Sequence, residues 1–220
     1  MKVDWNVFWP KLADATGQTV YMVLVTLLLS SALGLVLGLL LYATRKGNLL
    51  QNRAVFSLLN LLINLVRPVP FIIAIVAMAP LTRAVTGSMI GTEAAIFPMV
   101  VVATFGVARI VENNLVAVEP GVIEAARAMG AGPVRIILTV LVPEALGPLI
   151  LGLTFILVAL IDFSAVAGTV GGGGVGNLAM TYGYLRFDTS VMVVTVAVLI
   201  GLVQIAQLTG NLLARKVLRR

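Results

Sequence analysis

Three stretches of the sequence, 15–44, 163–185 and 189–214, contain no charged residue. A helix that crosses a bilayer needs about 20 apolar residues, so each stretch is long enough to provide one. Only 11% of the chain is charged, against roughly 25% in a soluble domain, so an ordinary water-facing surface cannot be built from it. The sequence therefore predicts an all-α integral membrane protein with one domain, residues 1–220. It excludes a soluble enzyme and a nucleic-acid-binding protein, although the net charge is +6.

The chain contains no cysteine and no histidine. Disulfides, thiol catalysis and thiolate metal sites are therefore excluded, and the usual general base and commonest metal ligand is missing. We expect no catalytic residue, no metal site and no cofactor on this chain.

The apolar stretches predict five membrane crossings, at about 19–43, 54–80, 93–111, 145–168 and 189–213. The second stretch is interrupted by Arg67, Pro68 and Pro70. Its first half, 54–66, would reach only about 20 Å as a helix, which is too short for a hydrocarbon core of about 30 Å. We therefore expect one crossing that bends near the prolines, with Arg67 and Pro68 in a structural role. Arg67 would bond carbonyls freed by the bend or extend to the cytoplasmic headgroups.

Lysine and arginine in the loops set the orientation of the crossings, because they concentrate on the cytoplasmic side. One side receives four: Lys2, Lys11, Arg83 and Arg186. The other receives ten: Arg45, Lys46, Arg53, Arg109, Arg127, Arg135, Arg215, Lys216, Arg219 and Arg220. The N-terminus is therefore predicted outside and the C-terminus in the cytoplasm. Residues 1–14 form an outer interfacial segment, in which Trp5 and Trp9 predict that 4–12 lies on the membrane surface.

Ser30, Gly34 and Gly38 recur at four-residue spacing in the first crossing. Small residues at this spacing let two helices approach closely, so we expect a packing role for them. Five helices are too few to enclose a solute path. We therefore expect a dimer with the path at or near its interface.

Residues 112–144 form the one long polar interruption, and they are predicted to face the cytoplasm. Pro120 favours the start of a helix and Gly130 favours its end. Pro133 favours a second helix that runs up to Pro143, where the fourth crossing begins. Small side chains beside charges suit the docking of the first helix into a groove of another protein. From the residues alone, a plain surface linker stays equally open.

This loop carries a motif with a definite spacing. Glu124-Ala125-Ala126, then Gly130, then Val140-Leu141-Val142-Pro143 resembles the EAA motif of ABC-importer permeases, although the family prefers isoleucine and leucine where Val140 and Val142 stand. The resemblance implies an ABC type I importer permease fold, in which this helix is the coupling helix that fits a cleft of a cytoplasmic ATPase. The residues implied in coupling are Glu124, Ala125, Ala126, Arg127 and Gly130.

Other segments resemble the methionine importer permeases, namely 42–45, 64–73, 80–83, 164–168, 171–176, 182–184 and 186–187. The resemblance covers nearly the whole chain from the first crossing onward. It implies a permease of the bacterial inner membrane that imports methionine, as the D or L isomer, or a related amino acid or peptide. The implied partners are a second copy of the chain, two copies of a separate ATPase that binds ATP and Mg²⁺, a periplasmic or lipid-anchored methionine-binding protein, and membrane lipid.

Asp162 is a carboxylate inside the fourth crossing, about 24 Å along a core of about 30 Å. A charge in the membrane interior costs about 2.5–3.5 kcal/mol on insertion scales, so it should face protein or water. It is a candidate for lining the path or holding an outer gate. A pair with an arginine, backbone donors or nearby headgroups would also account for it. By resemblance, residues 163–168 fit a gate segment, which adds Phe163, Ser164 and, at its centre, Val166.

Gly171, Gly173 and Gly176 have the spacing of a dinucleotide-binding fingerprint. That fingerprint requires a strand before it and a helix after it, whereas these glycines follow a membrane helix. We instead predict an external re-entry loop that folds tightly or flexes. The chain also has no Gly-Lys pair, which excludes a Walker A motif.

Two other classes of protein stay open as alternatives. A small ATP-independent secondary transporter would need intramembrane acids or histidines for proton coupling, and Asp162 is essentially the only such group. A membrane scaffold or channel subunit would not need the EAA spacing.

Overall fold

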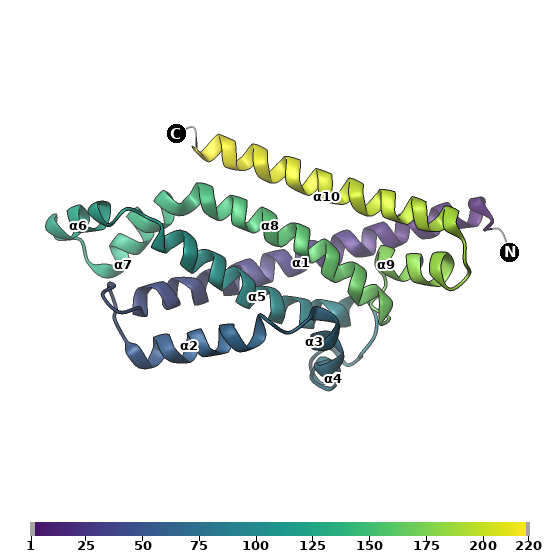
Figure 1. The fold of residues 1–220 in the computed structure, drawn as a ribbon, viewed down its shortest axis with the longest axis horizontal. Coiled ribbons are helices and arrows are strands. Elements are labelled where there is room, and N and C mark those ends of the chain that lie inside the picture. The colour runs from purple at the N-terminus through teal and green to yellow at the C-terminus, as the bar shows by residue number, and fades with distance from the viewer. Residues whose placement is uncertain (1–2, 219–220) are drawn as a thin grey trace.

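The computed structural model describes residues 3–218 and shows a bundle of long helices (Figure 1). Among these residues, four helices are each long and apolar enough to cross a membrane: α1 (Trp5–Thr44), α5 (Thr92–Val116), the continuous helix made by α7 (Pro133–Ile136), η1 (Ile137–Leu141) and α8 (Val142–Thr169), and α10 (Thr189–Leu218). The N-terminus and the C-terminus lie at opposite ends of the bundle. The predicted all-α membrane fold is confirmed.

The second predicted crossing is broken in the structure. Helices α2 (Arg53–Val66) and α3 (Phe71–Ala77) are bent by 103° at the break between them, and they have the length of a span only as a pair. Pro68 and Pro70 stand in the break, and neither can donate to a preceding carbonyl. The predicted bend is therefore present and is close to a right angle. Helix α4 (Ala79–Thr86) follows at once, and it leads into α5 at the side of the bundle.

Arg67 does not bond the carbonyls at this break. Its side chain is exposed and makes no hydrogen bond or ion pair with residues 3–218. Backbone groups take that role, since the Val69 N–H donates to the Val66 carbonyl at 3.1 Å and the Ala74 N–H to the Pro70 carbonyl at 3.0 Å.

The small residues of α1 bring it against α5. A Cβ placed on Gly34 would lie 2.5 Å from Cβ of Val107, and one placed on Gly38 would lie 2.5 Å from Cβ of Val111. Ser30, one turn earlier, is fully buried. The predicted packing role is confirmed, and the partner helix belongs to the same chain.

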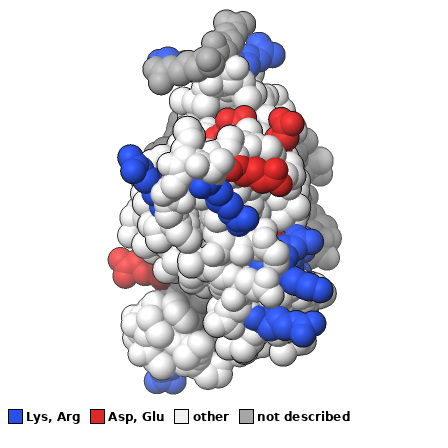
Figure 2. Space-filling view, turned by 90° about the vertical axis from the view of Figure 1, so that its left-hand side faces the viewer, with Lys and Arg blue, Asp and Glu red and all other residues white. Residues whose placement is uncertain are grey.

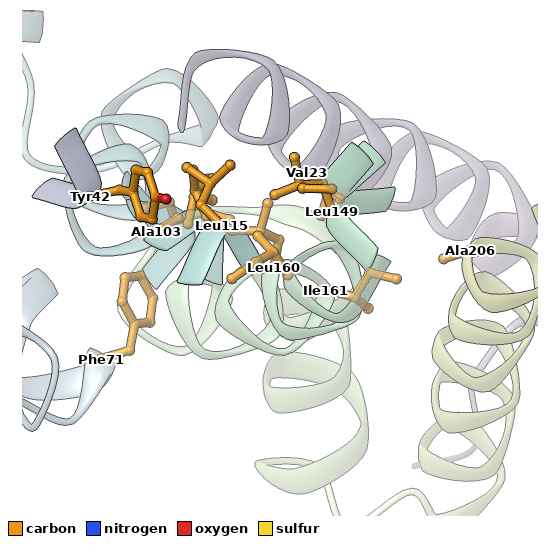
Figure 3. Packing of buried hydrophobic residues seen from close by; sticks show 14 of the residues in the cluster. Val23, Tyr42, Phe71, Ala103, Leu115, Leu149, Leu160, Ile161 and Ala206 are labelled. Carbon is orange, nitrogen blue, oxygen red and sulfur yellow. The ribbon is translucent and has the colours of Figure 1, made fainter. Parts of the chain in front are cut away.

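The core is one large cluster of buried apolar side chains along the bundle. Figure 3 shows that it gathers residues from helices far apart in the sequence, among them Val23, Tyr42, Phe71, Leu115, Leu160 and Ala206. Many large apolar side chains remain on the outside, such as Leu28 and Phe155, which are 71% and 69% exposed. An outer surface of this kind suits lipid rather than water.

Helix α1 begins earlier than the predicted crossing. Asp4 caps it by accepting the Asn6 N–H at 3.0 Å, and the helix then continues without a break to Thr44. Residues 5–14 are therefore the first turns of the spanning helix rather than a separate segment on the membrane surface. Residues 1–2 and 219–220 lie outside the described part, so Lys2, Arg219 and Arg220 of the charge count are not placed.

Two further boundaries differ from the prediction. The polar loop after α5 begins at Ala117 and ends at Gly132, since α5 extends to Val116 and the next helix starts at Pro133. Arg109 therefore lies within α5 rather than in the loop. The predicted orientation is unchanged.

Candidate functional site

The loop between α5 and α7 carries one short helix, α6 (Pro120–Ala128). Pro120 occupies its first turn, as predicted. Gly130 has a φ of 80°, a left-handed conformation that favours glycine. Its N–H donates to the Arg127 carbonyl, and the Ala131 N–H donates to the Ala126 carbonyl at 3.1 Å, so the last turn of α6 is closed. Local sequence chemistry therefore sets both ends of α6.

Helix α6 presents most of its motif to solvent. Glu124, Ala125 and Arg127 are exposed, whereas Ala126 is only 3% exposed and packs in the core. Met129, directly after the end of α6, is 82% exposed. Figure 2 faces this end of the bundle and shows Lys and Arg side chains on several sides of it, with a smaller group of acidic side chains. One buried alanine anchors the helix, and its charges and small residues remain available to a partner.

A cavity of about 220 Å³ separates α6 from the end of α1. Its wall includes Tyr42 from α1, Arg45 directly after α1, and Ile123, Glu124 and Arg127 from α6. Helix α6 thus stands slightly away from the body of the bundle, since only part of its inner face is packed.

A polar cluster that the sequence analysis missed lies beside this cavity. Glu112 of α5 is 3% exposed and forms an ion pair with Arg109 one turn away. The Arg109 guanidinium also donates to Oδ1 of Asn60 and of Asn64 on α2, both at 2.8 Å. Arg45, at the end of α1, lies 3.8 Å from Glu112. The sequence offered one signal for this cluster. Arg109 and Glu112 stand three residues apart in one apolar stretch, and Asn60 and Asn64 stand four residues apart in another.

Helix α6 connects to the third long span through only four residues, 129–132. The predicted second helix of the loop is not separate, because α7, η1 and α8 form one continuous helix from Pro133 to Thr169. Pro143 does not end a helix, since the wider π-helical turn η1 accommodates it, and the Val142 N–H donates to the Ile137 carbonyl. A displacement of α6 therefore acts on a helix about 55 Å long.

The candidate path residues in the outer half of α8 point in different directions. Asp162 is exposed on this chain and makes no hydrogen bond or ion pair with the described residues. Val166, one turn further, is partly buried on the same face. Phe163 instead stacks on Phe71 of α3, with ring centres 4.3 Å apart and planes 9° apart. Ser164 is buried and donates to the Ile161 carbonyl at 2.7 Å.

The glycine-rich segment after α8 folds tightly against α1. Gly173 and Gly174 both have positive φ angles, 78° and 72°. The Gly174 N–H donates to Oε1 of Gln18 at 2.8 Å, and the Val175 N–H donates to Oγ1 of Thr19 at 3.0 Å. Of the two predicted behaviours, tight folding rather than flexing matches these contacts. The short helices α9 (Gly174–Leu178) and η2 (Ala179–Tyr184) then lead to α10.

No group of three or more potential metal ligands gathers anywhere in residues 3–218. The arrangement instead combines an exposed cytoplasmic helix, a long helix attached to it, and, at the far end of that helix, a carboxylate without a partner among residues 3–218.

Comparisons with known proteins agree on one family. Residues 30–219 match the family described as binding-protein-dependent transport system inner membrane component. The chain is 46% identical over 206 residues to the probable D-methionine transport system permease protein MetI of Vibrio cholerae, covering 94% of this chain and 92% of that protein. It is 40% identical over 215 residues to the methionine import system permease protein MetP of Bacillus subtilis, covering 98% and 97%.

Solved structures agree with the sequence relatives. An inward-facing structure of the MetNI methionine ABC transporter matches with a TM-score of 0.94 at 38% identity, over 98% of this chain and 99% of that chain. An amino acid ABC transporter matches with a TM-score of 0.82 at 16% identity, which shows the fold alone.

Proposed function

Because this chain belongs to the family of binding-protein-dependent transport system inner membrane components, we propose that it forms the path for methionine in an ABC importer. It is a multi-pass permease subunit of the cytoplasmic membrane and not the ATPase of such a transporter. The substrate rests on relatives named for methionine or D-methionine transport that cover at least 94% of the chain. Either isomer, or a closely related amino acid, fits this proposal.

The observation that carries the proposal is the exposed motif of α6. A short helix with small side chains can sit deep in a groove, and its charges set the register of docking. Glu124, Ala125 and Arg127 are exposed on this helix, and Ala126 anchors it. We assign these residues to contact with a cytoplasmic ATPase, and Gly130 to the turn that ends the docking helix.

Docking at α6 would be transmitted to the path by the helix that follows it. Residues 129–132 are too few to absorb a large displacement, so α6 and the helix from Pro133 to Thr169 should move together. The outer half of that helix carries Asp162, which is exposed, and Val166, which is partly buried at the edge of the core. Phe163 links the same segment to α3, so the broken span would move with it.

The complete transporter would contain two copies of this chain, two copies of the ATPase and an external methionine-binding protein. The ATPase would hold ATP and Mg²⁺, and this chain would contribute no residue to hydrolysis. An exposed carboxylate inside the membrane should face protein or water. Asp162 therefore favours a path between the two copies of the chain.

Reconstitution in liposomes tests this function. The chain is combined with its ATPase and binding protein, and uptake of labelled L-methionine and D-methionine is measured with and without ATP on the ATPase side. We expect ATP-dependent uptake of methionine, and unlabelled leucine should inhibit this uptake only weakly. Glu124→Arg should abolish uptake while the protein stays in the membrane, because a reversed charge at the docking face misaligns the ATPase.

Each part of the proposal can fail separately. Methionine uptake by the chain without any ATPase would favour the secondary transporter that the sequence left open. ATP-dependent uptake of another amino acid, without methionine uptake, would overturn the substrate alone. Normal uptake by Glu124→Arg would overturn the assignment of α6.

A further inference from the structure

Two basic side chains flank one tyrosine at the outer end of the bundle. Lys11 of α1 donates a hydrogen bond to the Tyr182 hydroxyl at 2.7 Å, and the guanidinium carbon of Arg186 lies 4.4 Å from the centre of the Tyr182 ring. The hydrogen bond from Lys11 lowers the pKa of Tyr182 below its ordinary value. These three residues line a cavity of about 310 Å³ with Val7 and Phe8 from the first turns of α1.

Neither cation is neutralised within the described part of the chain. Lys11 and Arg186 form no ion pair there. Of the nearby carboxylates, Asp4 accepts the Asn6 N–H and Asp188 accepts the Ser190 and Val191 N–H groups, whereas Asp14 lines a second cavity that also includes Lys11. Asp4 stands in the wall of the cavity, and it offsets only one of the two positive charges. The wall of the cavity therefore carries one net positive charge, with Asp14 and Asp188 outside the wall, and it suits an anion.

The depth of this cavity in the membrane follows from α10. The uncharged run of α10 begins at residue 189, and Val191 is buried in one cluster with Phe8 and Leu12 of α1. The first turns of α1 thus lie level with the outer end of a membrane span, as Figure 1 also shows. Trp9 is 53% exposed at the same level, and tryptophan is enriched at the depth of lipid headgroups.

An exposed aromatic ring stands directly beside one of the cations. Phe187 is 90% exposed, and its φ of 53° lies in the left-handed region that a bulky residue rarely adopts. The Asp188 N–H donates to the Gly183 carbonyl at 2.9 Å, which holds the turn in this form. The loop therefore keeps an apolar ring outward next to Arg186, an arrangement that suits a ligand with a charged head and an apolar tail.

We propose that this cavity binds the phosphate of a phospholipid of the outer leaflet, with Lys11 and Arg186 as its ligands. Arginine donates two parallel hydrogen bonds to a phosphate, and lysine adds a compact charge. Val7, Trp9 and Phe187 then contact the glycerol and the upper acyl chains. Exposed apolar residues at headgroup depth favour a lipid over an acidic surface of a water-soluble protein.

Native mass spectrometry of the transporter purified in mild detergent tests the proposal. Added phosphatidylglycerol is titrated against wild type and against the double variant Lys11→Gln/Arg186→Gln. We expect binding to weaken about thirtyfold, the effect of losing two basic residues at an anionic headgroup. The charge-matched control Lys46→Gln/Arg53→Gln, at the other end of the bundle, should retain wild-type binding at this site. If the double variant does not fold, the single variant Arg186→Gln is titrated in its place and should also bind the lipid more weakly than wild type.

Three further measurements identify the ligand. Diacylglycerol with the same acyl chains should bind wild type and the double variant equally, because it lacks the phosphate. Inorganic phosphate should not displace the lipid, since it lacks the apolar part; displacement would show that a free anion occupies the site and would overturn the proposal. Tyr182→Phe should keep the lipid, because both cations remain.

Equal phosphatidylglycerol binding by wild type and the double variant would overturn the lipid site. If that result came with loss of uptake only when the binding protein delivers substrate, the surface would be a docking site for that protein. The proposed transport function does not depend on this outcome, because uptake of methionine is measured separately.

Discussion

At the cytoplasmic end of the molecule, Gly130 lies in open space, with no atom within 4 Å of the position that a Cβ would take. At the outer end, a Cβ on Gly168 would overlap the backbone nitrogen of Asn177, and one on Gly176 would overlap the carbonyl oxygen of Ala165. Gly130 is needed for its left-handed backbone, whereas Gly168 and Gly176 are needed because no side chain fits.

The two ends are therefore built for different tasks. The outer end fixes a folded-back loop on α1 by close backbone contact and by hydrogen bonds that the loop N–H groups donate to Gln18 and Thr19. The cytoplasmic end leaves α6 exposed beside a cavity, and α5 is joined to α2 there by Arg109, which donates to Asn60 and Asn64 and is paired with Glu112. Close packing resists displacement, while an exposed helix on a short connection can receive it.

Gly168→Ala should have the largest effect on stability. The added Cβ would overlap backbone atoms, which cannot shift without the rest of their segment. Overpacking of this kind lowers the free energy of unfolding by about 3 kcal/mol. Thermal unfolding in detergent measures the loss, with Gly17→Ala as the control. Gly17 lies in α1 with nothing within 4 Å of its Cβ position, so alanine there should keep or raise Tm. Equal unfolding of both variants would show that close packing around Gly168 does not stabilise the outer end.

Gly130→Arg should leave folding largely intact and strongly reduce transport. Gly47 is a close match, since it also has a positive φ, 87°, and open space around it at the same end. Both arginines carry similar backbone strain, so only the surface differs. We expect uptake to fall about tenfold or more in Gly130→Arg, as when a central docking residue is blocked. Similar losses in both variants would show that strain, not docking, is responsible.

Glu112→Gln should destabilise the cytoplasmic end by about 2 kcal/mol, because a hydrogen bond to a charged group contributes about that much and Arg109 loses its carboxylate. Glu144→Gln is the control, since Glu144 is exposed and has no ion pair among residues 3–218. Its effect should stay within about 0.5 kcal/mol. Thermal unfolding compares the two, and an unchanged Glu112→Gln would mean that the ion pair does not hold this end.

Asp162→Asn should change the kinetics of uptake more than the amount of protein in the membrane. The substitution keeps the shape and removes the charge of a side chain that has no partner in the described part of the chain. Initial rates at several methionine concentrations, normalised to membrane yield, measure the effect. Unchanged kinetics would make Asp162 a structural residue of the outer half of α8.

The smallest expected effect concerns Tyr182. Lys11 stabilises its phenolate by hydrogen bonding, so Lys11→Gln should raise the pKa of Tyr182 back toward its ordinary value. Ultraviolet titration of tyrosinate, with Tyr182→Phe subtracted, measures this shift. No change would mean that the Lys11 contact does not persist at the outer end.

Local chemistry explains why much of the cytoplasmic site could be predicted. Pro120 and Gly130 bound α6 because proline lacks an N–H and glycine accepts a left-handed backbone. The limits of the loop could not be read in the same way. Glu112 and Arg109 looked like loop charges. They lie inside the helix bundle because the fold brings the asparagines of α2 beside Arg109, where they accept its hydrogen bonds.

The sequence by itself determined that the chain is a helical membrane protein, how its crossings are oriented and where the short helix of the polar loop lies. These properties depend on apolar length, on loop charge and on residues adjacent in the chain. Tertiary structure alone decided the right-angle break between α2 and α3, the fusion of α7 with α8, and the direction in which Asp162 and Phe163 point. Each of these depends on contacts between distant segments. Local preferences leave several backbone conformations nearly equal in energy, and packing selects among them.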